Sequence, residues 1–465
     1  MADLLSILSA ASTSLSAQRA VTATASHNIN NANTPGYSRQ TAALEALTPA
    51  EQVNGAFIGR GATLTTVTQA RDRFLEAQIP QVMGNAAQSS AQSDALQAFH
   101  GLDPEASGGL GAAISGFYSS LRALSQNPSD SGLRTSFLGA AQTLARSFNV
   151  TSQDIESNRS GLDAQVSGLT GQINSEAAGV AQLNLQIRQA RASGAEPNDL
   201  LDLRQQHLDR LAALTGATPV PTSEGDVNVT LPGGLALVAG SRAGQLLPQA
   251  DPANGGHLAV VLKQADGTQL ALPSTALGGA LGGALSARDG ALKTAGNQVD
   301  QLAFDLASGV NAQHQAGYGL DGSTGLDLFD TGAPGVIAGA ARNMAVAAAI
   351  TSASLAMSTT GAPGDASNAQ LLLATESAKL SGGMDVQSTV SDVVSQFGSS
   401  SATAKAFADQ DTALRDNLTG LRDSYSGVSI DEEMITMQQA QRGYEAIIKV
   451  IKTADEMLQT LLAIK

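Results

Sequence analysis

Apolar and small residues recur at alternating spacings of four and three at both ends of the chain. The first set runs through Leu4, Leu8, Ala11, Leu15, Gln18, Thr22, Ala25 and Ile29. The second set runs through Ile430, Met434, Met437, Gln441, Tyr444, Ile448, Ile451, Asp455, Leu458 and Leu462. This spacing places each set on one face of an α-helix, as in a coiled coil, and predicts a helix at each end. We call the two sets the N-terminal seam and the C-terminal seam.

The N-terminal seam is weak, because half of its positions hold Ala, Gln or Thr. An isolated helix of this kind gains little from burying its seam, so it needs neighbours to become ordered. Two seams at opposite ends of the chain can pair only if the chain returns to its starting point. We therefore predict that the two terminal helices pair as a coiled coil and that the rest of the chain is inserted between them.

Turn and cap residues delimit the two terminal helices. The first helix runs into an Asn-rich stretch that closes with Asn33, Thr34, Pro35, Gly36 and Tyr37. Pro35 disfavours a helical conformation of the residue before it, and the Pro-Gly pair suits the two central positions of a type II turn. At the start of the last helix, Ser429 is followed three residues later by Glu432, which is the spacing of a capping box.

The interior of the chain predicts further helices and one strand-rich segment. A helical hairpin is expected over residues 155–214, with Asn198 as the cap of its second helix. Longer helical patterns cover residues 285–310 and 404–421. Residues 217–277 alternate instead, and an Asp-Gly turn there predicts a β-hairpin.

These patterns predict a mainly α protein with a smaller β part, divided into four regions. The terminal coiled-coil domain comprises residues 1–40 with 420–465. The mainly helical middle domain comprises residues 41–215, 284–325 and 366–419. A small β-rich domain covers residues 216–283, and Gly/Ala-rich loops and short strands cover residues 326–365.

Charge and composition favour an assembling structural protein. The 465 residues carry a net charge of −15, which repels phosphate backbones and anionic lipid headgroups. Only 14% of the residues are charged and 48 are Gly, a composition that suits thin packed layers and polar subunit contacts. We therefore expect neither nucleic acid nor membrane as a partner.

The sequence contains no recognisable catalytic, cofactor-binding or metal-binding constellation. Cys is absent, which excludes disulfides, thiolate metal sites and Cys nucleophiles. The five His residues lack metal-ligand spacing, and neither a Gly-x-Ser-x-Gly elbow nor a phosphate-binding Gly-rich loop occurs. The run Asp431-Glu432-Glu433 offers paired carboxylates, but at a helix N-terminus such a run more often stabilises the helix dipole. We expect no catalysis, no cofactor and no metal.

The first residues of the sequence do not have the pattern of a secretory signal peptide. They lack a basic stretch and a continuous apolar segment followed by a cleavage site, and no apolar run of about 18 residues occurs in the chain. We expect a cytoplasmic protein or one that is exported without a cleaved leader.

Several short motifs resemble those of bacterial flagellar axial proteins, the family of rod, hook and hook-associated subunits. Residues 31–39 resemble the A-N-T-x-G-Y motif that follows the first helix in this family, and residues 426–433 and 453–458 resemble its S-G-V-N-x-D-E-E and T-A-D-E-M motifs. Residues 71–78 and 198–204 are similar to its interior R-D-x-F-L-x-x-Q and N-x-L-L-D-x-R motifs. The combination resembles the hook-associated protein 1 family, the subunits of the hook–filament junction.

One position departs from the family pattern. Gly443 precedes Tyr444, where the family usually has Ala. A Gly inside a helix costs about 0.5 to 1 kcal/mol unless close packing uses its missing side chain.

The resemblance implies an exported structural subunit that polymerises at the distal end of the hook and joins hook to filament. It implies as partners other copies of the chain in a ring or helical array, the flagellar hook protein, the adjacent hook-associated protein on the filament side, and a cytoplasmic export chaperone on the C-terminal helix. It also implies an extracellular location at the hook–filament junction, reached by type III export without a cleaved signal peptide. The terminal helices would lie on the inner, axial side, with the inserted domains facing outward.

The resemblance and the seams together name the residues expected to mediate assembly. They are Leu4, Leu8, Leu15 and Ile29 of the N-terminal seam, the turn Asn33–Tyr37, the cap residues Ser429 and Glu432, and Met434, Met437, Tyr444, Ile448, Ile451, Leu458 and Leu462 of the C-terminal seam. We also expect residues 1–35 and 425–465 to be mobile in the isolated subunit and helical after assembly.

Two other functions stay open at this point. Another axial subunit, of rod or hook type, would share both terminal motifs but should lack the helical hairpin of residues 155–214. A secreted hydrolase built on flagellar-type ends would need an active site in the interior of the chain.

Overall fold

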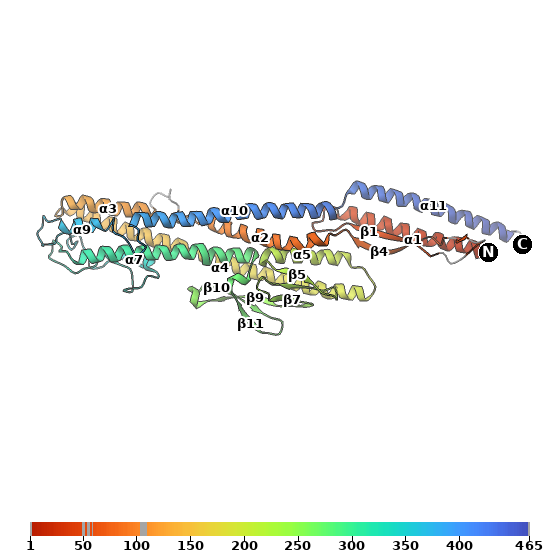
Figure 1. Cartoon of the computed structure of the whole chain (residues 1–465), viewed down its shortest axis with the longest axis horizontal. Coiled ribbons are helices and arrows are strands. Elements are labelled where there is room, and N and C mark those ends of the chain that lie inside the picture. Colours follow the sequence, from red (N-terminus) through yellow and green to blue (C-terminus); the bar gives the residue numbers. More distant parts are fainter. Residues whose placement is uncertain (1, 49–51, 54–55, 58, 103–108, 464–465) are drawn as a thin grey trace.

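The computed structural model describes residues 2–48, 52–53, 56–57, 59–102 and 109–463, and it is a long, narrow molecule with both termini at one end (Figure 1). The side chains of residues 2, 3, 52, 53, 56, 57, 461 and 462 are not described. The first and last helices, α1 (Ala2–Asn31) and α11 (Ile430–Ala463), lie side by side, and long helices form the rest of the rod. The predicted mainly α fold with paired terminal helices is confirmed.

Two strands cover another side of α1. Strand β1 (Gln40–Ala46) pairs antiparallel with β4 (Ala62–Gln69), with a register shift after Ala43, and β2 (Gln52–Val53) pairs with β3 (Ala56–Phe57) at the far end of the hairpin. The Ser14 hydroxyl of α1 accepts a hydrogen bond from the N–H of Ala62, at 3.2 Å. No strand is predicted for this stretch, which lies within the residues 41–215 assigned to the mainly helical middle domain. Thr occupies four of the eight positions of β4 and Val one, and β-branched residues favour strands.

The middle of the rod is a bundle of helices around one large apolar core. Its helices are α2 (Arg73–Gln97), α3 (Leu110–Gln126), α4 (Ser131–Ala192), α5 (Asn198–Thr215), α6 (Gly279–Ser286), α7 (Lys293–Gln315), α9 (Ser367–Ala374) and α10 (Val386–Ser426). At one end of the bundle, the rings of Phe117 and Phe137 lie 5.1 Å apart, centroid to centroid, and those of Phe117 and Phe329 lie 5.7 Å apart. Among the described residues, the main buried cluster includes no side chain of α1 or α11.

The predicted helical hairpin is present, with two differences. Its first helix, α4, begins at Ser131 rather than near residue 155, because Asp130 caps it by accepting the N–H of Leu133 at 2.9 Å. The second helix, α5, starts at Asn198, but this residue is not its cap. Instead, the Asn198 side chain donates to the carbonyl of Val67 in β4, at 2.8 Å, so it fastens the hairpin to the strands beside α1.

The strands between residues 218 and 272 form two small sheets on one side of the rod (Figure 1). One sheet contains β5 (Thr218–Pro221), β6 (Val227–Thr230), β7 (Ala236–Ala239) and β8 (Arg242–Ala243), and the other contains β9 (Gln245–Ala250), β10 (Leu258–Lys263) and β11 (Gln269–Leu272). The predicted hairpin across Asp266-Gly267 is the pair β10–β11. The buried Asn184 of α4 donates to the carbonyls of Val227 and Gly240, which holds the first sheet against that helix.

The remaining elements are short. They are η1 (Pro252–Asn254), η2 (Ser274–Ala276), the π-helical segment η3 (Ala287–Leu292) between α6 and α7, β12 (Phe329–Asp330), α8 (Ala340–Asn343) and β13 (Ala345–Val346). Between residues 326 and 365 the chain is mostly turns and loops with short strands, which agrees with the prediction for this segment.

The close contact between α6 and α5 depends on Gly279. Its φ is +58°, and a Cβ there would lie 2.5 Å from the carbonyl oxygen of Ala213. We expect Gly279→Ala to lower the free energy of unfolding by about 2 kcal/mol or more, through backbone strain and steric clash. In the control Gly139→Ala, a Cβ in the third turn of α4 would meet no atom within 4 Å, so we expect stabilisation by about 0.5 to 1 kcal/mol. Urea unfolding of both variants tests this, and equal midpoints would contradict it.

His314 at the end of α7 should make stability depend on pH. Its Nδ1–H donates to the carbonyl of Leu326 at 2.6 Å, and its Nε2 accepts the N–H of Ala356 at 3.0 Å, so the buried ring is neutral. Burial lowers the pKa of His314 below its usual value. The unfolded chain therefore binds a proton that the folded chain does not, and this stabilisation is complete above about pH 6.5 and lost as the pH falls.

We expect the free energy of unfolding to fall by up to ~1.4 kcal/mol per pH unit below about pH 6.5 because of this single group. Urea unfolding between pH 7.5 and 5.5 measures the slope. His314→Gln should flatten it, whereas His100→Gln, at an exposed position, should leave it unchanged. The same slope in the His314→Gln variant would contradict the assignment.

Candidate assembly site

The two terminal helices meet along one half of the C-terminal seam. Met437, Tyr444, Ile451 and Leu458 of α11 are half-buried beside α1, and Ala440 and Ala454 on the same side are buried. Near the middle of the pair, the Arg19 guanidinium donates to the hydroxyl of Tyr444 at 3.3 Å and lies 5.7 Å from its ring centroid. These positions recur every seven residues, so α1 follows one side of α11 for its whole length.

The other half of the C-terminal seam lies exposed. Met434 and Ile448 are 44% and 42% exposed, and the neighbouring Ile435 and Val450 are 56% and 49% exposed. The apolar stripe of α11 is therefore wider than the surface that α1 covers. Leu462 lies in α11, and its side chain is outside the described residues.

On α1, the predicted seam residues Leu4, Leu8, Leu15 and Ile29 are half-buried, and the small seam residues Ala11 and Ala25 are buried. These small side chains allow α1 to lie between α11 and the β1–β4 pair.

Gly443 uses this close packing. A Cβ at Gly443 would lie 3.2 Å from the side-chain amide carbon of Gln18. Gly in place of the expected Ala therefore leaves room for this polar residue of the N-terminal seam.

The turn after α1 has the predicted type II geometry. The N–H of Tyr37 donates to the carbonyl of Thr34 at 3.2 Å, and Gly36 has a φ of +75°. Asn33, Thr34, Pro35 and Gly36 are exposed. The Tyr37 hydroxyl points back to α1 and donates to the Asn28 side-chain oxygen at 2.8 Å.

A polar network joins this turn to α5. Buried Asn28 donates to the carbonyl of Gln40 at 2.8 Å and accepts the Gln40 N–H at 2.9 Å. The Gln40 side chain donates to Asp199 at 3.0 Å, and the N–H of Ser38 donates to Asp202 at 3.3 Å. The turn is thus anchored by groups on both the terminal helix and the hairpin.

The same segment binds the start of α11. The N–H of Arg39 donates to the carbonyl of Ser426 at 2.8 Å. The Arg39 guanidinium donates to Glu433 at 2.8 Å and to Glu432 at 3.1 Å, and the Glu433 carboxylate is only 3% exposed. Ser429 acts as the predicted cap in that its hydroxyl accepts the N–H of Glu432, at 3.5 Å. We call this set of contacts around residues 28–40 the joint.

The roles of Asn28, Arg39, Gln40 and Glu433 in the joint are not predicted from the sequence. There, Glu433 appears only in the acidic run at the start of the last helix and in a family motif, and Arg39 and Asp202 appear only as letters of family motifs. One signal in the sequence could have indicated these contacts. Asn, Tyr and Arg are concentrated around Pro35, and polar side chains of a turn point in different directions, so they can form hydrogen bonds with several neighbouring elements.

Burial governs the electrostatics of the joint. It raises the pKa of the Tyr37 hydroxyl, with nearby Asp199 adding to the effect. Burial also raises the pKa of Asp209, opposed by hydrogen bonds from Gln205 and Arg422, whose guanidinium lies 3.0 Å from the Asp209 carboxylate. Tyr37, Gln205, Asp209 and Arg422 line a cleft of about 260 Å³ beside the turn. In the described part of the chain, no three His, Asp or Glu side chains are placed to hold a metal ion.

Comparisons with known proteins agree with the motifs. A family model described as the flagellar hook-associated protein FlgK helical domain matches residues 100–329, and one described as the flagellar basal body rod FlgEFG protein C-terminal matches residues 423–464. Flagellar hook-associated protein 1 of Salmonella typhimurium is 31% identical over 332 residues, which is 71% of this chain and 60% of that protein. The chain belongs to the flagellar hook-associated protein 1 family.

More distant members of the hook-associated protein 1 family align over nearly the whole chain. The Escherichia coli K12 protein is 25% identical over 99% of this chain and 100% of its own length, and the Bacillus subtilis protein is 28% identical over 98% and 97%. The solved structure of the flagellar hook junction protein FlgK from Burkholderia pseudomallei has the same fold, with a TM-score of 0.64 and 20% identity over 77% of this chain and 100% of that chain. None of the helices that the structure describes is long and apolar enough to cross a membrane.

Proposed function

We propose that the chain is a structural subunit of the bacterial flagellum that polymerises at the distal end of the hook and joins the hook to the filament. The observation that carries the proposal is the exposed half of the C-terminal seam, on a member of a family named for the hook. Met434 and Ile448 lie on one side of α11 that α1 leaves open, and Ile435 and Val450 are further exposed apolar residues of the same helix. Exposed apolar surface of this kind marks protein interaction sites.

Neighbouring copies of the chain are the natural partners for this surface. Both seams continue along most of α1 and α11, so a helix of a second copy can bury the exposed half in the way that α1 buries the other half. Repetition of this contact gives a ring or helical array with the terminal helices inside and the β sheets facing outward. The hook protein and the adjacent hook-associated protein would bind at the two ends of the array.

Export belongs to the same proposal. The chain would leave the cell through the flagellar type III apparatus without a cleaved signal peptide, and an export chaperone would cover α11 before assembly. The terminal helices, residues 1–35 and 425–465, would be mobile until neighbours bury their seams, since no side chain of α1 or α11 belongs to the main core of the described residues. Hydrogen exchange on the monomer at low concentration checks this point, and strong protection of both helices would contradict it.

Deletion of the gene tests the function directly. Electron micrographs of the deletion strain should show hooks without filaments, and a plasmid copy of the full chain should restore them. Filaments on the hooks of the deletion strain would overturn the proposal.

The alternatives have less support. A rod or hook subunit is expected to lack the long hairpin that α4 and α5 form. A hydrolase needs a cluster of catalytic groups in the interior, and the described residues contain none of the His, Asp and Glu groupings that would hold a metal ion. Membership of the hook-associated protein 1 family supports a structural subunit rather than an enzyme.

A further inference from the structure

Helix α10 carries a row of large apolar residues that lie exposed on one flank. Phe407, Leu414 and Leu421 follow one another at intervals of seven residues and are 57%, 49% and 49% exposed, and Tyr425 is 57% exposed. Gln410 and Asn417, both exposed, occupy the positions between them. The spacing is that of one side of a coiled coil. We call these six residues the α10 row.

None of the six residues of the α10 row is charged, although other residues of α10 are. Lys405 pairs with Asp409 at 3.1 Å, Arg415 with Asp416 at 2.7 Å, and Arg422 with Asp209 at 3.0 Å. The cations of this part of α10 are therefore neutralised within the chain itself. In a chain with a net charge of −15, such a row is a surface that a second copy can approach without like-charge repulsion.

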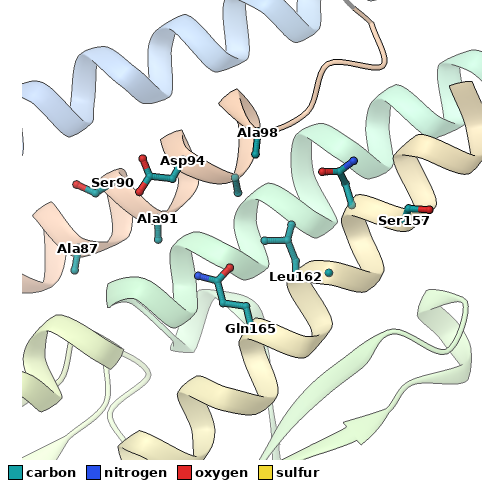
Figure 2. Close-up of a pocket in the computed structure, with 11 residues that line it drawn as sticks. Ala87, Ser90, Ala91, Asp94, Ala98, Ser157, Leu162 and Gln165 are labelled. Atoms are coloured by element: carbon teal, nitrogen blue, oxygen red, sulfur yellow. The ribbon is translucent and has the colours of Figure 1, made fainter.

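A groove between α2 and α4 offers room for large side chains. Its volume is about 630 Å³, and Figure 2 shows it with α2 on one side and α4 on the other. The α2 wall is made largely of Ala and Ser side chains, and the α4 wall contributes Leu162 and Gln165. The walls thus combine apolar surface with amide and hydroxyl groups and with the carboxylate of Asp94, whereas the α10 row brings apolar side chains, two amides and the Tyr425 hydroxyl.

The row and the groove lie at the same level of the rod but on different sides of it. The Ser89 hydroxyl of α2 donates to the Asp411 carboxylate of α10, so Phe407 and Leu414 stand at the level of residue 89. Ala87 and Ala91, which line the groove, are each two residues from Ser89 and point about 160° away from it around the helix. The row of one copy therefore cannot enter its own groove, whereas that of a copy alongside can.

We propose that the α10 row of one subunit inserts into the α2–α4 groove of the next subunit. The proposal rests on the proposed function, because it names the contact between copies in the middle of the rod. A contact of row with row would be isologous and would close after two copies, whereas a row in a groove is heterologous and repeats around a ring. Gln410 would find a polar partner in Gln165 of the groove.

The absence of Cys from the chain makes cross-linking a clean test. The full chain with Gln410→Cys and Gln165→Cys is expressed as the sole copy in a deletion strain, and hooks with attached filaments are isolated, oxidised and analysed without reducing agent. Both substitutions replace exposed polar residues and leave the apolar residues of the row intact. The matched control combines Gln165→Cys with Asp409→Cys, which lies one residue before Gln410 and is turned by about 100° around α10.

We expect the Gln410→Cys/Gln165→Cys chain to form a ladder of dimers and larger species, with at least tenfold less product from the control and from each single variant. Dimers from Gln410→Cys alone would mean that row meets row and would overturn the proposal. Monomers alone, in hooks that contain the double variant, would also overturn it. Failure of the proposed function is distinguishable, because the unmodified chain would then be missing from the isolated hooks before any oxidation.

Discussion

A chain carrying Leu458→Asp should fold in its middle region and fail to assemble. Leu458 is half-buried between α11 and α1, on the side of the C-terminal seam that the two helices share. The substitution forfeits about 1 to 2 kcal/mol of apolar burial and places a carboxylate in the half-buried contact between the two helices, so pairing of the terminal helices is lost. The expected result is loss of the chain from isolated hooks, of filaments and of swimming, with an unchanged urea midpoint for the helical rod.

The matched control for this experiment is Thr460→Asp. Thr460 is exposed two residues further along α11, so its carboxylate stays in water and assembly should continue. Because a chaperone on α11 would also be sensitive to Leu458→Asp, the amount of exported chain in the medium must be measured separately. Normal incorporation of the Leu458→Asp chain into hooks would show that the seam is wrongly assigned.

Removal of the Arg39 side chain should release the start of α11 from the joint. Glu433 is 3% exposed and its carboxylate accepts from Arg39 at 2.8 Å, so Arg39→Ala leaves a buried charge without its cation. We expect a loss of about 2 to 3 kcal/mol in local stability, because an uncompensated buried charge costs more than the pair contributes. In the assembled protein, hydrogen exchange at residues 430–440 should accelerate by a factor of about 30 to 150, whereas exchange in α4 should not change.

A second substitution separates charge from packing. In the double variant Arg39→Ala/Glu433→Gln the buried group is neutral, so much of the protection of α11 should return. Lys452→Ala, at an exposed position of the same helix, should leave the exchange rates as they are. If the double variant exchanges as fast as Arg39→Ala alone, the loss comes from missing contacts of the Arg39 side chain and not from the stranded carboxylate.

Periodicity predicted the terminal helices and their pairing because a helix face is a local property of the sequence. The same periodicity could not tell which half of the C-terminal seam α1 covers. Met437 and Met434 are equally apolar, but the first is half-buried beside α1 and the second is 44% exposed. That choice depends on where α1 is held, and it is held by the β1–β4 pair, for which the sequence analysis contains no expectation.

The joint was harder to predict than the seams for a related reason. Its contacts connect residues far apart in the chain, such as Ser38 with Asp202 and Arg39 with Glu433. Single polar residues carry no periodic signal, so a sequence shows that Asn28 and Arg39 are present without showing their partners. The turn itself was predictable, since Pro35 and Gly36 fix its type by their own backbone preferences.

The joint also responds to salt differently from the two helical parts of the molecule that it connects. Its contacts are hydrogen bonds and ion pairs, and within the described chain the large apolar cluster stops short of it. Added sulfate screens exposed ion pairs while strengthening apolar burial. Concentrated sulfate is therefore expected to strengthen the packing of the helical bundle and of the paired terminal helices, while it weakens the exposed Arg39–Glu432 ion pair that links them.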